Sequence, residues 1–135
     1  MHKVFKSVDE QQMDAFEQEA IGKYDEKTVK TSLRQWGQYS DQQKQVILNE
    51  GNQIYIELVE AMALGAESIR VQTLIRRWRH HLSFFWTPKI DQLQGLADTY
   101  HQDARFKANF DALHPELSEF MGRAVKVYVR RHTID

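Results

Sequence analysis

Apolar residues recur along most of the chain at the three- and four-residue spacing of one helical face. The clearest pattern lies in 40–65. Ser40 and Gln43 form the sequence pattern of a capping box at its start, and Gly65 after the last apolar residue is typical of a helix C-terminus. The segment therefore predicts one long amphipathic helix, interrupted by Gly51 in its middle.

The same spacing predicts four further helices towards the C-terminus. The first begins at Ser68 and continues through Trp86, and Pro88 then takes the first position of the second. Asp103 caps the third, and Pro115 stands where the fourth begins. Each of these segments presents one stripe of apolar residues for burial.

Two weaker helices are predicted at the N-terminus, over 9–23 and 26–36. This third of the chain has the fewest apolar residues per turn, so we expect it to be mobile until something binds. Strand-like alternation, internal repeats and interdomain linkers are absent from the sequence. The prediction is a single compact all-α domain of about six to seven helices.

Composition narrows the function. The 135 residues carry 18 Lys and Arg against 19 Asp and Glu, for a net charge of -1. This balance disfavours direct binding to nucleic acid. The chain has no cysteine, which excludes disulfides and thiolate chemistry and fits a reducing compartment. Neither a signal peptide nor a long apolar run is evident, so we expect a cytoplasmic protein without a membrane partner.

The segment "RRWRHHLSFFW", residues 76–86, draws attention to itself by its charges. On a helix, Arg76 and His80 point away from Trp78, so the arginines form a solvated surface and not a single DNA-reading stripe. The adjacent histidines lie about 100° apart, which is the wrong spacing for a shared metal. His81 lies beside the buried stripe, either as a half-buried histidine or as a pocket donor.

The aromatics of this segment carry more information than its charges. Phe84, Phe85 and Trp86 leave a helix in three directions, so one core face cannot bury all of them. At least one must face another interface or a cavity. An aromatic stripe is nevertheless more often core than ligand box.

No nucleotide-binding, serine-hydrolase or metalloprotease motif occurs, so we expect a protein that is not an enzyme and that needs no cofactor. One alternative is a metal- or haem-binding α-domain that uses His81, His101 or His114. Another is a hydrolase that acts on a bound ligand.

Taken in order, five segments resemble the TipAS antibiotic-recognition domain. That domain occurs as the C-terminal effector module of some MerR-type transcription regulators and in stand-alone drug-binding proteins. The most specific piece is the pattern Tyr-x-x-Asp-x-Arg-Phe, filled by Tyr100, Asp103, Arg105 and Phe106. The resembling segments are 17–32, 39–66, 71–78, 95–111 and 115–128.

The resemblance implies a globin-like arrangement without haem, whose cleft binds bulky, ring-rich antibiotics such as thiopeptide-like or albicidin-like compounds. It also implies that the N-terminal helices close over the ligand, so 1–38 is expected to be a mobile helical lid of a single domain over 1–135. A stand-alone chain would sequester the drug, whereas a piece of a regulator would bias a DNA-binding state. A homodimer is left open as a further partner.

Where the family commonly carries a histidine this chain has Trp78, and where an aromatic follows three residues later it has His81. Asp103 with Arg105 is expected to brace a helix start. For Tyr100, Phe106 and Phe110, a place in the core is at least as strongly expected as a place in the cleft. The predicted ligand-binding residues are Tyr55, Trp78, His81, Phe85, Trp86, Tyr100, Phe106 and Phe110, with Trp36 and Tyr39 on the mobile N-terminal side.

Overall fold

The computed structural model describes residues 26–133. The expected helix over 9–23, and most of the expected lid over 1–38, lie outside these residues. The described part contains six α-helices and no strand, which confirms the all-α prediction. The elements are α2 (Glu26–Gly37), α3 (Asp41–Ala61), the short 3-10 helix η1 (Met62–Leu64), α4 (Ile69–Leu82), α5 (Ile90–Gln102), α6 (Ala104–Asp111) and α7 (Leu117–Thr133).

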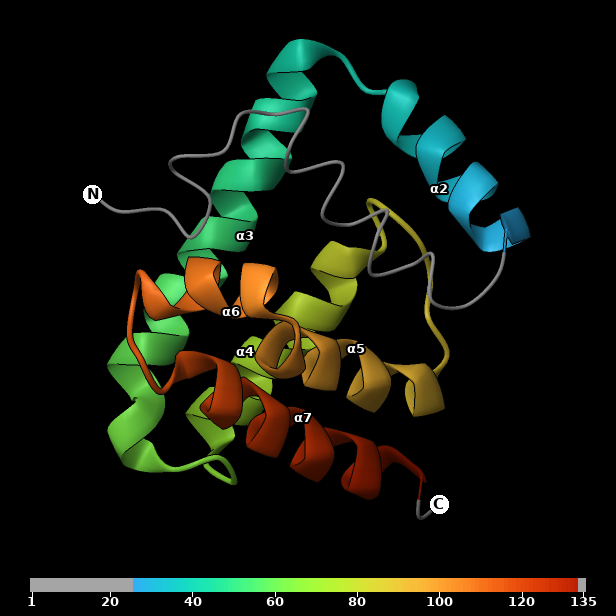
Figure 1. The fold of residues 1–135 in the computed structure, drawn as a ribbon. Helices are drawn as coiled ribbons and strands as arrows, with labels where there is room; N and C mark the ends of the chain where they lie inside the picture. Colours follow the sequence, from blue (N-terminus) through green and yellow to red (C-terminus); the bar gives the residue numbers. More distant parts are fainter. Residues whose placement is uncertain (1–25, 134–135) are drawn as a thin grey trace.

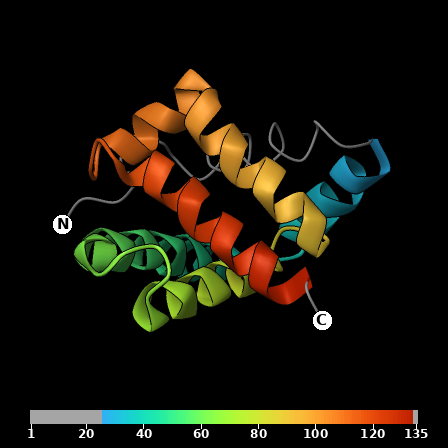
Figure 2. The same cartoon turned by 90° about the horizontal axis from the view of Figure 1, so that it is seen from below.

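The helices pack in two layers (Figures 1 and 2). One layer is the hairpin of α3 and α4, and the other is made of α5, α6 and α7, with α5 lying along α7. Contacts between α4 and α7 join the two layers. Helix α2 lies to one side of this body, beside the segment that links α4 to α5 (Figure 1). The fold is thus a packed five-helix body with one peripheral helix.

The core lies between the two layers and is made of the apolar stripes that the sequence pattern marks. Leu58, Leu74, Leu93, Leu96 and Met121 have no exposed surface. Each fully buried side chain of this kind stabilises the fold by about 1.5–3 kcal/mol relative to an exposed position. The body is therefore a stable platform on which more weakly held elements can move.

The start of α3 is the predicted capping box. The Ser40 hydroxyl oxygen accepts from the Gln43 backbone N–H at 3.1 Å, and the Gln43 side-chain oxygen accepts from the Ser40 backbone N–H at 2.8 Å. The helix runs without a break through Gly51, and the chain turns at Gly65, whose φ of 93° favours glycine. The expected interruption at Gly51 is wrong, and a contact of His81 described below explains this glycine. The α-helix itself ends at Ala61, before the predicted end, and η1 continues the run to Leu64.

The sequence prediction was also wrong between α4 and α5. Helix α4 ends at Leu82, and a turn over 83–85 follows. The Ser83 hydroxyl donates to the His80 carbonyl, and this side-chain hydrogen bond competes with the backbone hydrogen bonds that another helical turn would form. Leaving the helix also allows the two aromatics Phe85 and Trp86 to be buried together, which a helix would prevent.

Helix α5 begins at Ile90, with Lys89 at its N-cap, two residues later than Pro88. A proline restricts the residue before it to extended conformations, which keeps this linking segment non-helical. Helix α7 likewise begins at Leu117, after a turn at Pro115.

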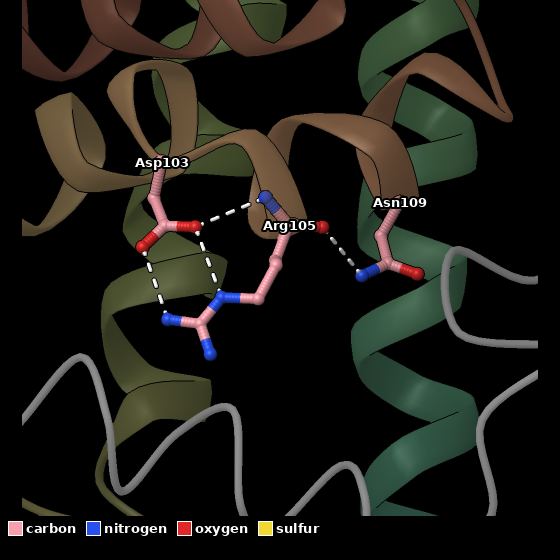
Figure 3. Close-up of polar contacts among 3 residues, drawn as sticks. All are labelled: Asp103, Arg105 and Asn109. Carbon is pink, nitrogen blue, oxygen red and sulfur yellow. Dashed lines mark hydrogen bonds and ion pairs between the residues drawn. The ribbon is translucent and has the colours of Figure 1, made fainter.

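The corner between α5 and α6 is built on Asp103 (Figure 3). One of its carboxylate oxygens accepts from the Arg105 backbone N–H at 3.0 Å, and the other lies 3.3 Å from the Arg105 guanidinium. The Asn109 side-chain amide donates to the Arg105 carbonyl at 3.0 Å. Asp103 is the N-cap of α6, as predicted, and the Asp-x-Arg part of the motif is explained by this corner.

Glu57 holds α3 to α4. Its Oε1 lies 3.1 Å from the Arg77 guanidinium and 2.7 Å from that of Arg70. The hydrogen bond from Arg77, with that from Arg70, lowers the pKa of Glu57 below its ordinary value, against the opposing effect of its partial burial. Because the native pKa is the lower one, the stabilisation is complete above about pH 4.5 and is lost as the pH falls through the native pKa.

Replacing Glu57 with glutamine is therefore expected to lower the free energy of unfolding by about 0.5–1 kcal/mol at pH 7, since both arginines are partly exposed. The difference from wild type should shrink in acid, where Glu57 itself becomes protonated. Urea unfolding at pH 7 and at a pH well below 4.5 measures the difference in the free energy of unfolding. Glu60→Gln, one turn further along α3 and exposed, is the matched control. An equal deficit at both pH values would contradict the assignment.

Candidate functional site

The C-terminal end of α2 is held against the 83–86 turn by aromatic rings. Trp36, only 3% exposed, stacks on Phe85 with ring centroids 4.8 Å apart and planes inclined by 25°. Tyr39 meets Phe84 edge to face at 6.3 Å, and meets Trp36 in the same manner at 5.8 Å. Such pairs add about 0.5–1.5 kcal/mol each to the gain from burial. The contact is compact and lies at one end of the helix.

Polar groups complete this attachment. The side-chain amide of Gln35 donates to the Ser83 carbonyl at 2.6 Å and to the Tyr39 hydroxyl at 3.3 Å. The ammonium of Lys44, on the second turn of α3, lies 5.4 Å from the centre of the Trp36 ring, which is within range for a cation–π contact. These contacts attach α2 through Gln35, Trp36 and the connection that follows the helix, and Ser32, one turn before Trp36, is also buried.

A hollow opens beside this contact, between the start of α3 and the 83–86 turn. We name it the Tyr39–Phe84 hollow; its volume is about 360 Å³, and its lining is Tyr39, Gln42, Gln43, Val46, Ile47 and Phe84. Val46 is 62% exposed and contributes apolar surface to this lining. The hollow offers a ring-sized apolar surface with two amides at its edge.

A second hollow lies between α2 and the beginning of α5. We name it the α2–α5 groove; it has a volume of about 410 Å³ and is lined by Lys27, Thr31 and Gln35 from α2, Trp86 and Thr87 from the linking segment, and Lys89 and Gln92 near the start of α5. The linking segment passes beside α2 in both ribbon views (Figures 1 and 2). Residues adjacent in sequence to the Trp36–Phe85 stack therefore line both hollows.

His81 supports the floor of this region. Its ring contacts Phe84 and Phe85 edge to face, each at 5.7 Å. Its Nε2 lies 2.7 Å from the Ile47 carbonyl, which can only accept, so Nε2 carries the hydrogen and donates. Burial lowers the pKa of His81, so the ring is neutral at pH 7. His81 is therefore a donor committed to the backbone of α3.

The ring of His81 also explains Gly51. A Cβ atom at position 51 would stand 2.8 Å from Cε1 of His81, closer than such atoms approach in proteins. The glycine costs the helix about 1 kcal/mol relative to alanine. That cost allows the imidazole to lie directly against α3.

The other predicted site residues form a separate aromatic group in the core. Tyr100 is its centre, with ring centroids 5.0 Å from Phe110, 5.8 Å from Phe106 and 6.4 Å from Trp78. Tyr55 meets Phe110 at 5.0 Å. All five are buried, and none lines the hollow or the groove. A ligand contact for these five stays a prediction.

The structure thus brings together Trp36, Tyr39, His81, Phe85 and Trp86, of which only Tyr39 and Trp86 line a hollow. Trp36, Phe85 and Trp86 belong to the same buried core as the remaining five. Several lining residues were missed by the sequence prediction, chiefly Phe84, Gln35, Val46, Lys27 and Lys89. Only Phe84 had a signal, because three consecutive aromatics cannot all enter one core. The other four line the site through packing between helices distant in sequence.

The histidine alternative gains no support from the described residues. Across 26–133, no three His, Cys, Asp or Glu side chains lie close enough together to hold a metal ion. His101 Nδ1 pairs with the Ser118 hydroxyl at 2.9 Å, and His114 Nδ1 accepts from the Glu116 backbone N–H at 3.1 Å.

Among the helices of residues 26–133, none has the length and apolar character needed to cross a membrane.

Comparison with known protein families gives one matching model. Residues 16–128 match the TipAS antibiotic-recognition domain. Among curated proteins, the HTH-type transcriptional regulator SkgA of two Caulobacter vibrioides strains is 26% identical over 106 residues, which is 76% of this chain. The match covers 40% of each regulator, so the chain spans less than half of their length.

A solved structure has the same fold. It is the complex of TipAS with nosiheptide, from a thiopeptide antibiotic multidrug resistance system of Streptomyces lividans. The TM-score is 0.79, and the likeness covers 96% of this chain and 92% of that chain at 23% identity. The arrangement of helices described above is therefore the TipAS arrangement.

Proposed function

The chain belongs to the TipAS antibiotic-recognition domain family, and from this membership we propose that it binds a bulky, ring-rich antibiotic between α2 and the five-helix body. The carrying observation is the attachment of α2. The stack of Trp36 on Phe85 and the hydrogen bond from Gln35 to the Ser83 carbonyl help to hold its C-terminal end against the 83–86 turn, beside the two hollows.

We propose that the ligand binds at this attachment. The rings of Trp36 and Phe85 face each other in the structure. A planar ligand ring inserted beside them would contact these rings in place of part of their contact with each other, so one aromatic contact would replace another. Helix α2 then acts as a lid, together with the residues that precede it. The closed body below supplies a fixed wall, since its core is fully packed.

The dimensions of the two hollows fit such a ligand. Volumes of about 360 and 410 Å³ each lie within the range of about 300–1,000 Å³ that small-molecule sites occupy. The lining combines aromatic and aliphatic surface with amides, hydroxyls and the ammonium groups of Lys27 and Lys89, which suits a compound with several rings and polar groups. The solved relative is in complex with a thiopeptide antibiotic, nosiheptide.

We propose that the output is binding without chemical turnover, in the cytoplasm. A chain acting alone would protect by sequestration, in proportion to protein concentration over the dissociation constant. In a longer protein, closure of α2 would bias a DNA-binding domain, and the regulators related to this chain favour that second output. A homodimer, and the absence of direct nucleic-acid contacts by this chain, stay predictions.

Titration of the full chain with nosiheptide and, separately, with albicidin tests the proposal. Trp86 lines the α2–α5 groove, and Trp36 stacks on Phe85, next in sequence to lining residues, so a ligand should quench part of the tryptophan emission in a saturable way. At a ligand concentration 100 times the dissociation constant, the native state gains about 2.7 kcal/mol, which appears as a raised melting temperature. Ligand recovered intact after long incubation would support binding over hydrolysis.

Two variants localise the effect. Phe84→Ala, in the wall of the hollow, should weaken binding about tenfold, equivalent to about 1.4 kcal/mol. Leu64→Ala, at an exposed position beyond the other end of α3, should leave the affinity unchanged. The proposal fails if neither compound shifts emission or melting temperature at tens of micromolar.

A further inference from the structure

The α2–α5 groove is positively charged as well as polar. Its lining includes two ammonium groups, those of Lys27 and Lys89, and no carboxylate. Within 26–133, neither lysine forms an ion pair with another residue. Two cations therefore face one cavity without a counter-charge from its walls.

The surroundings increase this positive potential. Arg34 lies on the same side of α2 as Lys27, two helical turns further on, and borders a neighbouring surface depression together with Lys27. Asp91, in the first turn of α5, is exposed and does not line the groove. The positive potential of the α2–α5 groove is thus only partly offset by the negative charge of Asp91 outside it.

Lys89 occupies a position that does not favour a lysine. It is the N-cap of α5, where the helix dipole is positive and where Ser, Thr, Asp or Asn would accept a first-turn hydrogen bond. A lysine side chain can only donate. The start of α5 is capped instead by Gln92, whose side-chain oxygen accepts from the Lys89 backbone N–H at 2.8 Å, so the exposed Lys89 ammonium takes no part in capping and can face an anion in the groove.

The remaining lining sets the shape of the ligand. Trp86, 6% exposed, contributes a small part of its ring to one wall, so a ligand ring would meet its full surface only when α2 moves aside, and Thr31 and Gln35 contribute a hydroxyl and an amide from α2 on the other. A flat ring lying along Trp86 would carry a substituent towards the lysines. Hydrogen bonds from ammonium groups to a carboxylate are about twice as strong as neutral ones.

We infer that the α2–α5 groove binds an ionised carboxylate attached to an aromatic ring. The ligand class of this domain is accordingly an anionic aromatic compound, held by Lys27 and Lys89 at its charged end and by Trp86 along its ring. This inference deepens the proposed function and rests on it. It adds a charge requirement that a neutral drug does not meet.

The test uses 2-naphthoate and the neutral 2-naphthamide as matched probes, with binding to the full chain followed by the quenching of tryptophan emission. We expect the carboxylate to bind about tenfold more tightly than the amide. The double variant Lys27→Gln/Lys89→Gln should abolish this preference without changing the affinity for the amide. Lys126→Gln, an exposed lysine on α7, should retain the preference. Circular dichroism verifies that each variant is folded.

Equal affinities of the two probes for the wild type would overturn the inference, and so would a preference that survives in the double variant. Nosiheptide, titrated against the same three proteins, separates this failure from failure of the proposed function. If nosiheptide binds while the carboxylate preference is absent, the drug-binding role stands and the anion site falls. If nosiheptide and albicidin do not bind but naphthoate binds through the lysines, the anion site stands and the antibiotic role falls.

Discussion

Replacement of Trp36 with alanine is expected to weaken antibiotic binding at least tenfold while leaving the body of the protein folded. Truncating a buried tryptophan removes about 3–5 kcal/mol of favourable contact. Here that contact is the stack on Phe85, which holds the end of α2 in place. Because α2 has few other contacts with the body, most of the variant should have α2 released.

Release lowers affinity because the binding-competent state becomes a minor population, and the apparent dissociation constant rises by the same factor. Hydrogen exchange should show this directly as faster exchange of α2 amides with α4, α5 and α7 unchanged. The matched control is Leu33→Ala on the same helix, a side chain 39% exposed. A Trp36→Ala variant with wild-type affinity and wild-type protection of α2 would exclude the lid assignment.

Replacement of Gly51 with alanine is expected to destabilise the fold by about 1–3 kcal/mol, even though alanine is the better helix former. The added Cβ meets Cε1 of His81 at 2.8 Å, and the ring cannot retreat freely because it donates to the Ile47 carbonyl. Its displacement should also disturb Phe84, in the wall of the hollow. Denaturant unfolding gives the loss of stability.

The same substitution should change sign in a His81→Ala background. With the imidazole gone, alanine at 51 should stabilise by about 0.5–1 kcal/mol, the ordinary helix-propensity gain. Gly122→Ala in α7 is the control with an intact histidine, since a Cβ there has no atom within 4 Å, and it should stabilise by a similar amount. If Gly51→Ala stabilised the wild-type protein, the contact with His81 would be refuted.

Much of this architecture follows from local sequence signals. The capping box at Ser40, the end at Gly65 and the cap at Asp103 all lie where the sequence predicts, because each depends on residues within one helical turn. The predicted end of α4 was wrong because the chain leaves the helix after Leu82, which allows Phe85 and Trp86 to be buried. This burial depends on packing against α2, which is distant in sequence.

The site was less predictable than the fold. Aromatic residues occur both in cores and in pockets, so the sequence prediction combined the residues of two aromatic clusters. Helical spacing places Trp78 on the buried stripe, where it is 1% exposed, but it cannot state which partners a ring meets. Gly51 and His81 are 30 residues apart, and their contact requires the packing of α3 on α4.

The one-sided attachment of α2 makes this helix a lever. Measured from its last residue, Gly37, at about 1.5 Å per residue, Lys27 lies about 15 Å along the helix axis, whereas Trp36 is the adjacent residue. Any rotation about the connection to α3 therefore displaces Lys27 much further than Trp36, whereas Lys89 stays fixed on the body. A small shift of the stacked rings therefore produces a large change in the width of the α2–α5 groove. The distance between Lys27 and Lys89 should accordingly increase with the size of the bound ligand.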